Sequence, residues 1–450
     1  MFARGIKRSC QIKLTGFTDL EKREIYKDNF AEYLLCLALD VGEGMLKSGA
    51  EISRVEDSIE RICYAYGAVH VEVFSIISFI NAAIRMPDGS YSSQLRRIKF
   101  TSTNLGMLEK LNGLSRKICA EKPTLEDFDA KMHSLKRATY YKAPLLCAAS
   151  GAATGGFAVF FGGKWNDALI ALLIGIIIAF LDLKMPARVN VMAKTVISSA
   201  LAAAAAIISA KIGIASSADY VIIGSIMLLV PGVAFGTAMR DLLYGDLLAG
   251  TLKILQAILL ALMIAFGYML SVELLGVFGI DIEVTPTAAP DYKKFFKPMF
   301  FIASIGALVG SVSFATMFKV APRHLIYGGT AGLVTYVVYY TVEFYTQGDT
   351  FPAAFISTVC AALFAEIASR TRKAPTIVFL LPAVIPIVPG GILYRAMRSL
   401  LLLDFNRAFE ALLTTLQIGL GIAGGILTVS IIFGSIMEKI KKGMTKVNDK

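Results

Sequence analysis

The chain has 450 residues, of which 56% are hydrophobic and 18% charged, with a formal net charge of +11. A soluble domain carries about a quarter of its residues as charges, so this composition argues against a protein that is soluble throughout. Residues 1–142 carry 40 charged residues, and the much longer stretch 143–450 carries 39. This division predicts a soluble N-terminal domain followed by a membrane domain. The positive-inside bias of membrane proteins accounts for the net charge, and nucleic-acid binding is not expected.

The N-terminal part is predicted to be a polar tail at 1–30 and a small cytoplasmic α+β domain at 31–142. Helical spacing of apolar residues, alternating strands and turn residues give its predicted elements: two helices within 31–66, two strands between 70 and 84, a turn at 87–89, a strand at 91–100, and helices at 103–120 and 124–137. Nothing in this domain assembles a catalytic set, and no cofactor or metal site is expected anywhere in the chain. An enzyme is therefore not expected.

Ten apolar segments of about 20 residues, each long enough to cross a bilayer, follow along the chain: 143–163, 166–183, 194–214, 219–239, 247–275, 297–318, 324–344, 351–369, 376–395 and 405–437. They predict a multi-span α-helical membrane protein with five spans in each half. The predicted divisions are membrane repeat 1 at 143–275, an outer linker loop at 276–297, membrane repeat 2 at 298–437 and a basic cytoplasmic tail at 438–450.

The orientation follows from the basic residues of the short loops. With the N-terminus inside, the inner loops and tail carry fourteen Lys and Arg and the outer loops carry seven. This excess predicts a protein of the cytoplasmic (inner) membrane whose N-terminus and C-terminus are both cytoplasmic.

The two halves contain related sequence. The stretch VPGVAFGTAMRDLLYGD at 230–246 and the stretch VPGGILYRAMRSLLLLD at 388–404 share nine of seventeen residues without a gap. An odd number of spans in each copy makes the second copy enter the membrane upside down. The sequence therefore predicts two inverted five-helix repeats, an arrangement typical of secondary transporters.

Both copies interrupt an apolar span with Pro-Gly. Proline removes an N–H and glycine frees the backbone, so each pair is expected to break its helix in mid-membrane, where free backbone groups face protein or a water-filled cavity. Half-helix N-termini attract anionic groups such as a carboxylate. An ordinary proline kink is the alternative. The candidate substrate-binding residues at and near the breaks are Pro231, Gly232, Thr237, Pro389, Gly390, Gly391 and Tyr394.

Charged residues within or beside the spans are candidates for coupling and gating because charge is expensive in a membrane. Glu366 is a candidate proton-coupling carboxylate, although it could equally pair with Arg370 one helical turn later. Arg240 and Arg398 are equivalent in the two copies, and each is followed by an aspartate that could form a gate with it or anchor the interface. The remaining candidates of this group are Asp241, Asp246 and Asp404.

Two stretches resemble the signatures of the threonine/serine exporter family. The first lies at 46–56 and contains Gly49, Glu51, Arg54 and Glu56, and the second lies at 374–395 and contains the run VPGG. Residues 231–250 also match the pattern of that family's first membrane half. The resemblance covers about 31–435 and implies a ten-span inner-membrane carrier that exports threonine and serine with the proton gradient. Some relatives divide the architecture over two chains and are linked to dicarboxylate (succinate) export.

The sequence thus predicts a secondary active transporter that exports threonine or serine, with a dicarboxylate exporter or a channel for small metabolites as alternatives. Its expected partners are the small-molecule substrate, protons and the lipid bilayer. A second copy of the chain, in a homo-oligomer, is left open.

Overall fold

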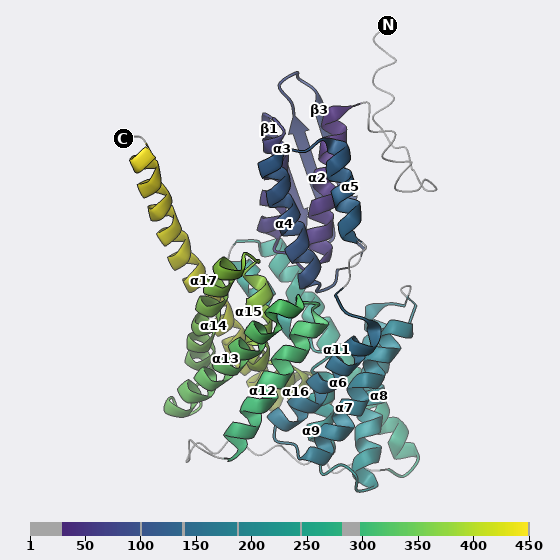
Figure 1. The fold of residues 1–450 in the computed structure, drawn as a ribbon. Coiled ribbons are helices and arrows are strands. Elements are labelled where there is room, and N and C mark those ends of the chain that lie inside the picture. The colour runs from purple at the N-terminus through teal and green to yellow at the C-terminus, as the bar shows by residue number, and fades with distance from the viewer. Residues whose placement is uncertain are drawn as a thin grey trace. The chain divides into compact units, whose positions relative to one another are not determined.

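The computed structural model describes residues 29–99, 101–136, 140–186, 189–243, 245–280 and 298–448. These residues form two compact units (Figure 1). The N-terminal unit contains residues up to 103 and 110–138, and the membrane unit contains 104–109 and the chain from 139 onward. Most of the predicted tail at 1–30 and of the predicted outer loop at 276–297 lies outside the described residues.

The N-terminal unit is the expected small α+β domain. Its elements, in chain order, are α2 (Phe30–Lys47), α3 (Ile52–Ala65), β1 (His70–Ile76), β2 (Phe79–Arg85), β3 (Tyr91–Arg97), α4 (Leu105–Glu121) and α5 (Leu125–Lys136), of which the first residues of α4 belong to the membrane unit. The predicted helices and strands of this domain are confirmed, and the outer ends of the predicted ranges agree to within three residues, because apolar periodicity and turn residues mark these elements clearly.

The three strands form an antiparallel sheet in the order β1-β2-β3. In the second hairpin Gly89 adopts a φ of 83°, which glycine takes without strain, and the Asp88 carboxylate accepts the Ser90 N–H at 2.8 Å. One face of the sheet packs against α2 and α3 through buried side chains such as Ile80 and Ile84. The alternation of buried and exposed side chains along the strands therefore gives this unit a core on one face of the sheet.

The membrane unit consists of helices. Their bounds are α6 (Ala143–Phe160), α7 (Trp165–Lys184), α8 (Val191–Lys211), α9 (Ala218–Ile226), α10 (Gly232–Leu243), α11 (Leu247–Val277), α12 (Pro298–Met317), η1 (Pro322–His324), α13 (Leu325–Tyr345), α14 (Thr350–Arg372), α15 (Ile377–Val384), η2 (Ile385–Ile387), α16 (Gly390–Leu401) and α17 (Phe405–Asn448). The last of these includes the predicted tenth span and continues through most of the predicted basic tail as one helix (Figure 1).

Within the described residues eight helices are long and apolar enough to cross a membrane, and there are nine if the bent pair α15–α16 is counted as one span. The protein is thus a multi-span helical membrane protein. The predicted fourth span, 219–239, differs from a single long helix. It is divided into α9 and α10, each shorter than the about 20 residues that a crossing requires. The Pro-Gly pair at 231–232 accounts for this division.

Packing in the two halves follows the same plan. Helix α6 packs on α7 as α12 packs on α13, and α8 packs on α11 as α14 packs on α17. Likewise α10 packs on α11 as α16 packs on α17. Between the halves α6 packs on α12, while α10 contacts α17 and α16 contacts α11. Equivalent helices therefore make equivalent contacts, as expected for a duplicated unit.

A buried carboxylate fixes the loop before α9. The side chain of Asp167, in the first turn of α7, is fully buried. Its Oδ1 accepts the N–H groups of Ser216 and Ser217 at 2.6 and 3.1 Å, and its Oδ2 accepts the Lys164 N–H at 2.8 Å. This one side chain satisfies three backbone donors that would otherwise lack acceptors.

Asp167→Ala is therefore expected to destabilise the membrane unit by about 3 kcal/mol or more, because it leaves buried N–H groups unsatisfied. The measurement is the unfolding midpoint of the purified protein in detergent. Asp182→Ala is the matched control, because Asp182 is exposed and makes only a surface ion pair with Lys194 at 3.1 Å. Equal midpoints for the two variants would contradict the role given to Asp167.

Candidate functional site

The second Pro-Gly pair breaks its helix as predicted. Between α15 and α16 the backbone leaves the helical conformation at Val388, with φ −62° and ψ 128°, and the two helix axes differ in direction by 51°. Pro389 immediately precedes α16, and the first hydrogen bond of that helix runs from the Leu393 N–H to the Pro389 carbonyl at 2.9 Å. The N–H groups of Gly391 and Ile392 thus precede the helical ladder, at the positive end of α16.

The first Pro-Gly pair also begins a new helix. Helix α9 ends at Ile226, a turn follows, and α10 begins at Gly232 directly after Pro231. The turn is closed by hydrogen bonds from the N–H groups of Leu229 and Val230 to the Ile226 carbonyl, at 2.7 and 3.0 Å. Both predicted breaks are therefore present, and each places a helix N-terminus at Pro-Gly.

The two breaks meet. A β-carbon added to Gly390 would lie 2.7 Å from Val230 Cγ1 and 3.3 Å from Met227 Sδ, so the start of α16 touches the turn before α10. All eight residues of α15 are buried, as are six consecutive residues of α9, 221–226. Helices that are apolar and buried all round lie in the interior of a bundle. The broken segments therefore lie in the interior of the membrane unit.

Helices α9 and α16 lie antiparallel to each other. At one end Val230, just after α9, contacts Gly390 at the start of α16. At the other end Asp219, in the first turn of α9, pairs with Arg398 in the last turn of α16, with 3.8 Å between Oδ1 and Nη1. The two half-helices thus share one side of the membrane unit, from the breaks to this ion pair.

A polar cluster lies along these two half-helices. The Tyr394 ring packs edge to face on the ring of Tyr268 from α11, with 5.9 Å between centroids. The Arg398 guanidinium lies over the Tyr268 ring at 4.9 Å from its centroid. Two buried atoms of this cluster, Tyr394 Oη and Arg398 Nε, have no hydrogen-bond partner among the described residues, and neither has Ser225 Oγ on α9. A buried polar atom without a hydrogen bond lowers the stability of the folded protein. Such atoms are therefore candidates for hydrogen bonds to a ligand or to water.

The other predicted substrate-binding residues make ordinary contacts with their neighbours. Gly391 leaves room for a β-carbon at ordinary contact distance from the Phe161 ring, 3.4 Å. The Thr237 hydroxyl donates to the Ala234 carbonyl at 3.1 Å, within its own helix. The structure thus places Gly390, Gly391 and Tyr394 in α16, directly after Pro389, and Thr237 on the second turn of α10.

The predicted coupling residue Glu366 lies near the end of α14. Arg370 contacts both its carboxylate and its carbonyl oxygen, the latter at 2.9 Å, and the Thr376 hydroxyl donates to its Oε1 at 3.2 Å. The pairing with Arg370 that the sequence suggested as an alternative is therefore present.

The predicted gates take other partners. Arg398 pairs with Asp219, whereas Asp404 pairs with Arg407 at 3.4 Å on the exposed start of α17. In the first half the buried carboxylate of Asp241 pairs with Lys253 of α11. Asp246 directly precedes α11, and the side chain of Arg240 lies outside the described residues. Of these partners the sequence missed Asp219 and Tyr268, because neither belongs to the repeated motif and both reach the site only through the tertiary fold.

Among the described residues no group of three or more His, Cys, Asp or Glu side chains could hold a metal ion.

Two sequence profiles of known protein families match the chain. One, of threonine/serine exporters, matches residues 36–275, which is more than half of the chain. The second, described as "Threonine/Serine exporter, ThrE", matches residues 303–432. The chain belongs to the threonine/serine exporter family. This membership confirms the resemblance seen in the two signature stretches and points to a transporter rather than an enzyme.

Two relatives of this chain show how widely the similarity extends. The "Threonine/serine exporter" of Corynebacterium glutamicum is 22% identical over 406 residues, which cover 86% of this chain and 81% of the relative. The "Pheromone-regulated membrane protein 10" of Zygosaccharomyces rouxii is 25% identical over 298 residues, covering 63% of this chain and 29% of the relative. A comparison with solved structures found no match.

Proposed function

We propose that this chain is a secondary active transporter that exports threonine or serine across the cytoplasmic membrane and is coupled to protons. Membership in the exporter family and the likeness to a relative named a threonine/serine exporter support the choice of substrate. The proposed mechanism rests on one observation: the two helix breaks contact each other, through Val230 and Gly390, in the interior of the membrane unit.

The substrate would bind where the two half-helices begin. Its carboxylate would accept hydrogen bonds from free N–H groups at the start of α16, such as those of Gly391 and Ile392, where the helix dipole favours negative charge. The unpartnered hydroxyls of Tyr394 and Ser225 are suited to the polar groups of a hydroxy amino acid. Pairing at Asp219–Arg398 would close one side of this site, and pairing at Asp241–Lys253 the other.

The antiparallel contact of α9 with α16 supports the inverted arrangement of the two halves. In secondary transporters, inverted repeats place the substrate site at their interface and expose it alternately to the two sides. Under the same proposal the N-terminal unit and the end of α17 lie in the cytoplasm, as the distribution of Lys and Arg predicts.

Counterflow in proteoliposomes tests this function. Vesicles are loaded with unlabelled threonine, serine or succinate, and each is tested against its own labelled form outside. Transient accumulation with threonine or serine is expected. Accumulation with succinate alone would overturn the choice of substrate but keep a carrier, and leakage without transient accumulation would indicate a pore instead.

Glu366→Gln is expected to abolish the stimulation of transport by a pH gradient and to leave counterflow intact, because counterflow requires no net proton movement. The measurement is labelled threonine flux with and without the gradient. Glu410→Gln, an exposed carboxylate on α17, is the matched control. An unchanged response to the gradient in Glu366→Gln would show that the Arg370 pair serves structure alone.

A further inference from the structure

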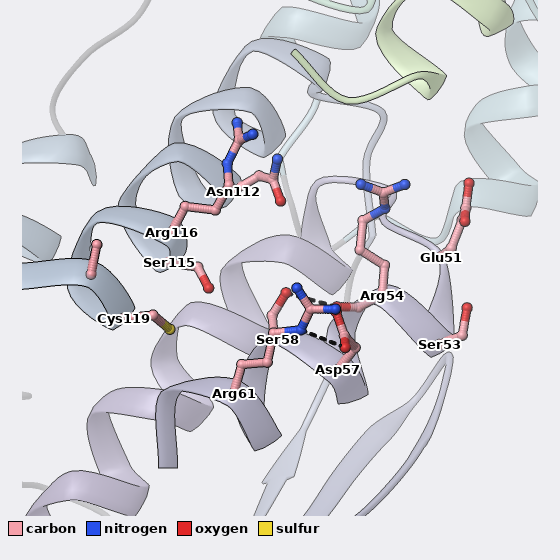
Figure 2. A pocket seen from close by; sticks show the side chains of 11 residues that line it. Glu51, Ser53, Arg54, Asp57, Ser58, Arg61, Asn112, Ser115, Arg116 and Cys119 are labelled. Atoms are coloured by element: carbon pink, nitrogen blue, oxygen red, sulfur yellow. Dashed lines mark hydrogen bonds and ion pairs between the residues drawn. The ribbon is translucent and has the colours of Figure 1, made fainter. Parts of the chain in front are cut away.

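The N-terminal unit contains a polar hollow between α3 and α4 (Figure 2). Its volume is about 770 Å³, which lies within the range of small-molecule sites. All of its lining residues belong to this one unit. They are Glu51, Ser53, Arg54, Asp57, Ser58, Arg61, Asn112, Ser115, Arg116, Cys119 and Ala120. Ten of these eleven carry a polar or thiol side chain, so the hollow is suited to a polar ligand rather than an apolar one.

The charges of the hollow favour an anion. Its lining includes three arginines and two carboxylates. The Arg61 Nε–H donates to Asp57 Oδ1 at 2.7 Å, so these two charges offset each other locally. The remaining charged side chains of the lining are Arg54, Arg116 and Glu51, so arginines outnumber carboxylates by three to two. Burial raises the pKa of the Cys119 thiol, which therefore adds no negative charge near neutral pH.

Arg54 contributes a buried hydrogen-bond donor to the hollow. Its Nε–H is buried and has no hydrogen-bond partner within the described part of the chain. A buried guanidinium N–H without an acceptor is unfavourable, and a guanidinium can bind the two oxygens of a carboxylate or phosphate at once. In Figure 2 Arg54 extends from α3, and Asn112 and Arg116 extend from α4, on the other side of the same hollow. Donors from two helices thus border one cavity.

We propose that this hollow binds a small organic oxyanion, a metabolite that carries a carboxylate or a phosphate group. Arg54 and Arg116 would bind the anionic group from the two helices, and the Asn112 amide would donate a further hydrogen bond. The transport proposal assigns no role to this cavity, and the inference does not depend on it. An anion bound here would be an effector of the protein rather than its cargo.

Equilibrium dialysis of the purified full-length protein in nanodiscs tests the site, with labelled inorganic phosphate and labelled citrate as probes. Saturable binding of at least one probe is expected. Arg54→Gln should weaken it tenfold or more, because it removes a charge-assisted pair of hydrogen bonds. Arg97→Gln is the matched control, since Arg97 is an exposed arginine of β3 outside the hollow. Arg398→Gln, in the membrane unit, should bind the probe like the parent protein.

The two probes separate the two chemical sources of the anion. Binding of citrate alone assigns the site to carboxylates, and binding of phosphate alone assigns it to phosphorylated metabolites. Arg116→Gln, at an exposed side chain, supplies a second test if Arg54→Gln does not fold. The proposal is overturned if neither probe saturates, if Arg54→Gln and Arg116→Gln bind like the parent protein, or if only Arg398→Gln loses binding.

Discussion

Gly390→Ala is expected to lower threonine counterflow by about tenfold or more, although alanine is the better helix former. The added β-carbon would lie 2.7 Å from Val230 Cγ1, far inside normal contact distance. Valine is branched at its own β-carbon and has little freedom to turn away. The start of α16 would therefore be pushed from the turn before α10, and the two helix N-termini would no longer meet at the substrate.

A second substitution should relieve this collision. Val230→Ala removes the colliding Cγ1, so the double variant Gly390→Ala/Val230→Ala is expected to recover most of the lost counterflow, a coupling that a double-mutant cycle measures. Gly424→Ala, in α17, is the matched control, because its β-carbon would meet the Phe355 ring at an ordinary 3.4 Å. The proposed meeting of the breaks would be wrong if Gly390→Ala were fully active, or if Val230→Ala did not improve it.

The breaks could be predicted from sequence because their cause is local. Proline and glycine act on the backbone of their own turn. Their repetition at 230–232 and 388–390 indicates a helix break common to both halves rather than an isolated proline kink. The helices and strands of the N-terminal unit were predictable for the same reason. Where the fourth span divides, the same local cause produced two short helices in place of one span of ordinary length.

The partners of the charged residues could not be predicted in this way. The motif places Arg398 near Asp404 in the sequence, but α17 turns away after Asp404, which pairs instead with Arg407. The carboxylate that reaches Arg398 comes from Asp219, on the half-helix of the other repeat. Contacts of this kind depend on which helices pack together, and a single sequence does not specify that packing.

Exchange of the partly buried ion pair between Asp219 and Arg398 tests whether this packing matters for transport. Arg398→Gln leaves the Asp219 carboxylate without its cationic partner, in a place where the two side chains are only 14% and 18% exposed. Breaking a buried pair from one side typically costs about 3–5 kcal/mol, far more than the pair itself contributes. We therefore expect Arg398→Gln and Asp219→Asn each to lower threonine counterflow more than tenfold.

The reversed pair, Asp219→Arg/Arg398→Asp, should recover part of this loss, because it keeps one charge of each sign at the ends of α9 and α16. Arg407→Gln is the matched control: its pair with Asp404 is 72% and 39% exposed, and surface pairs contribute about 0–1 kcal/mol. Thermal midpoints measured on the same samples separate loss of fold from loss of transport.

Full activity in Arg398→Gln would show that the ion pair has no role in transport. Inactivity of the reversed pair at an unchanged midpoint would instead assign Arg398 a direct role at the substrate, since its guanidinium contacts both Asp219 and the aromatic ring of Tyr268.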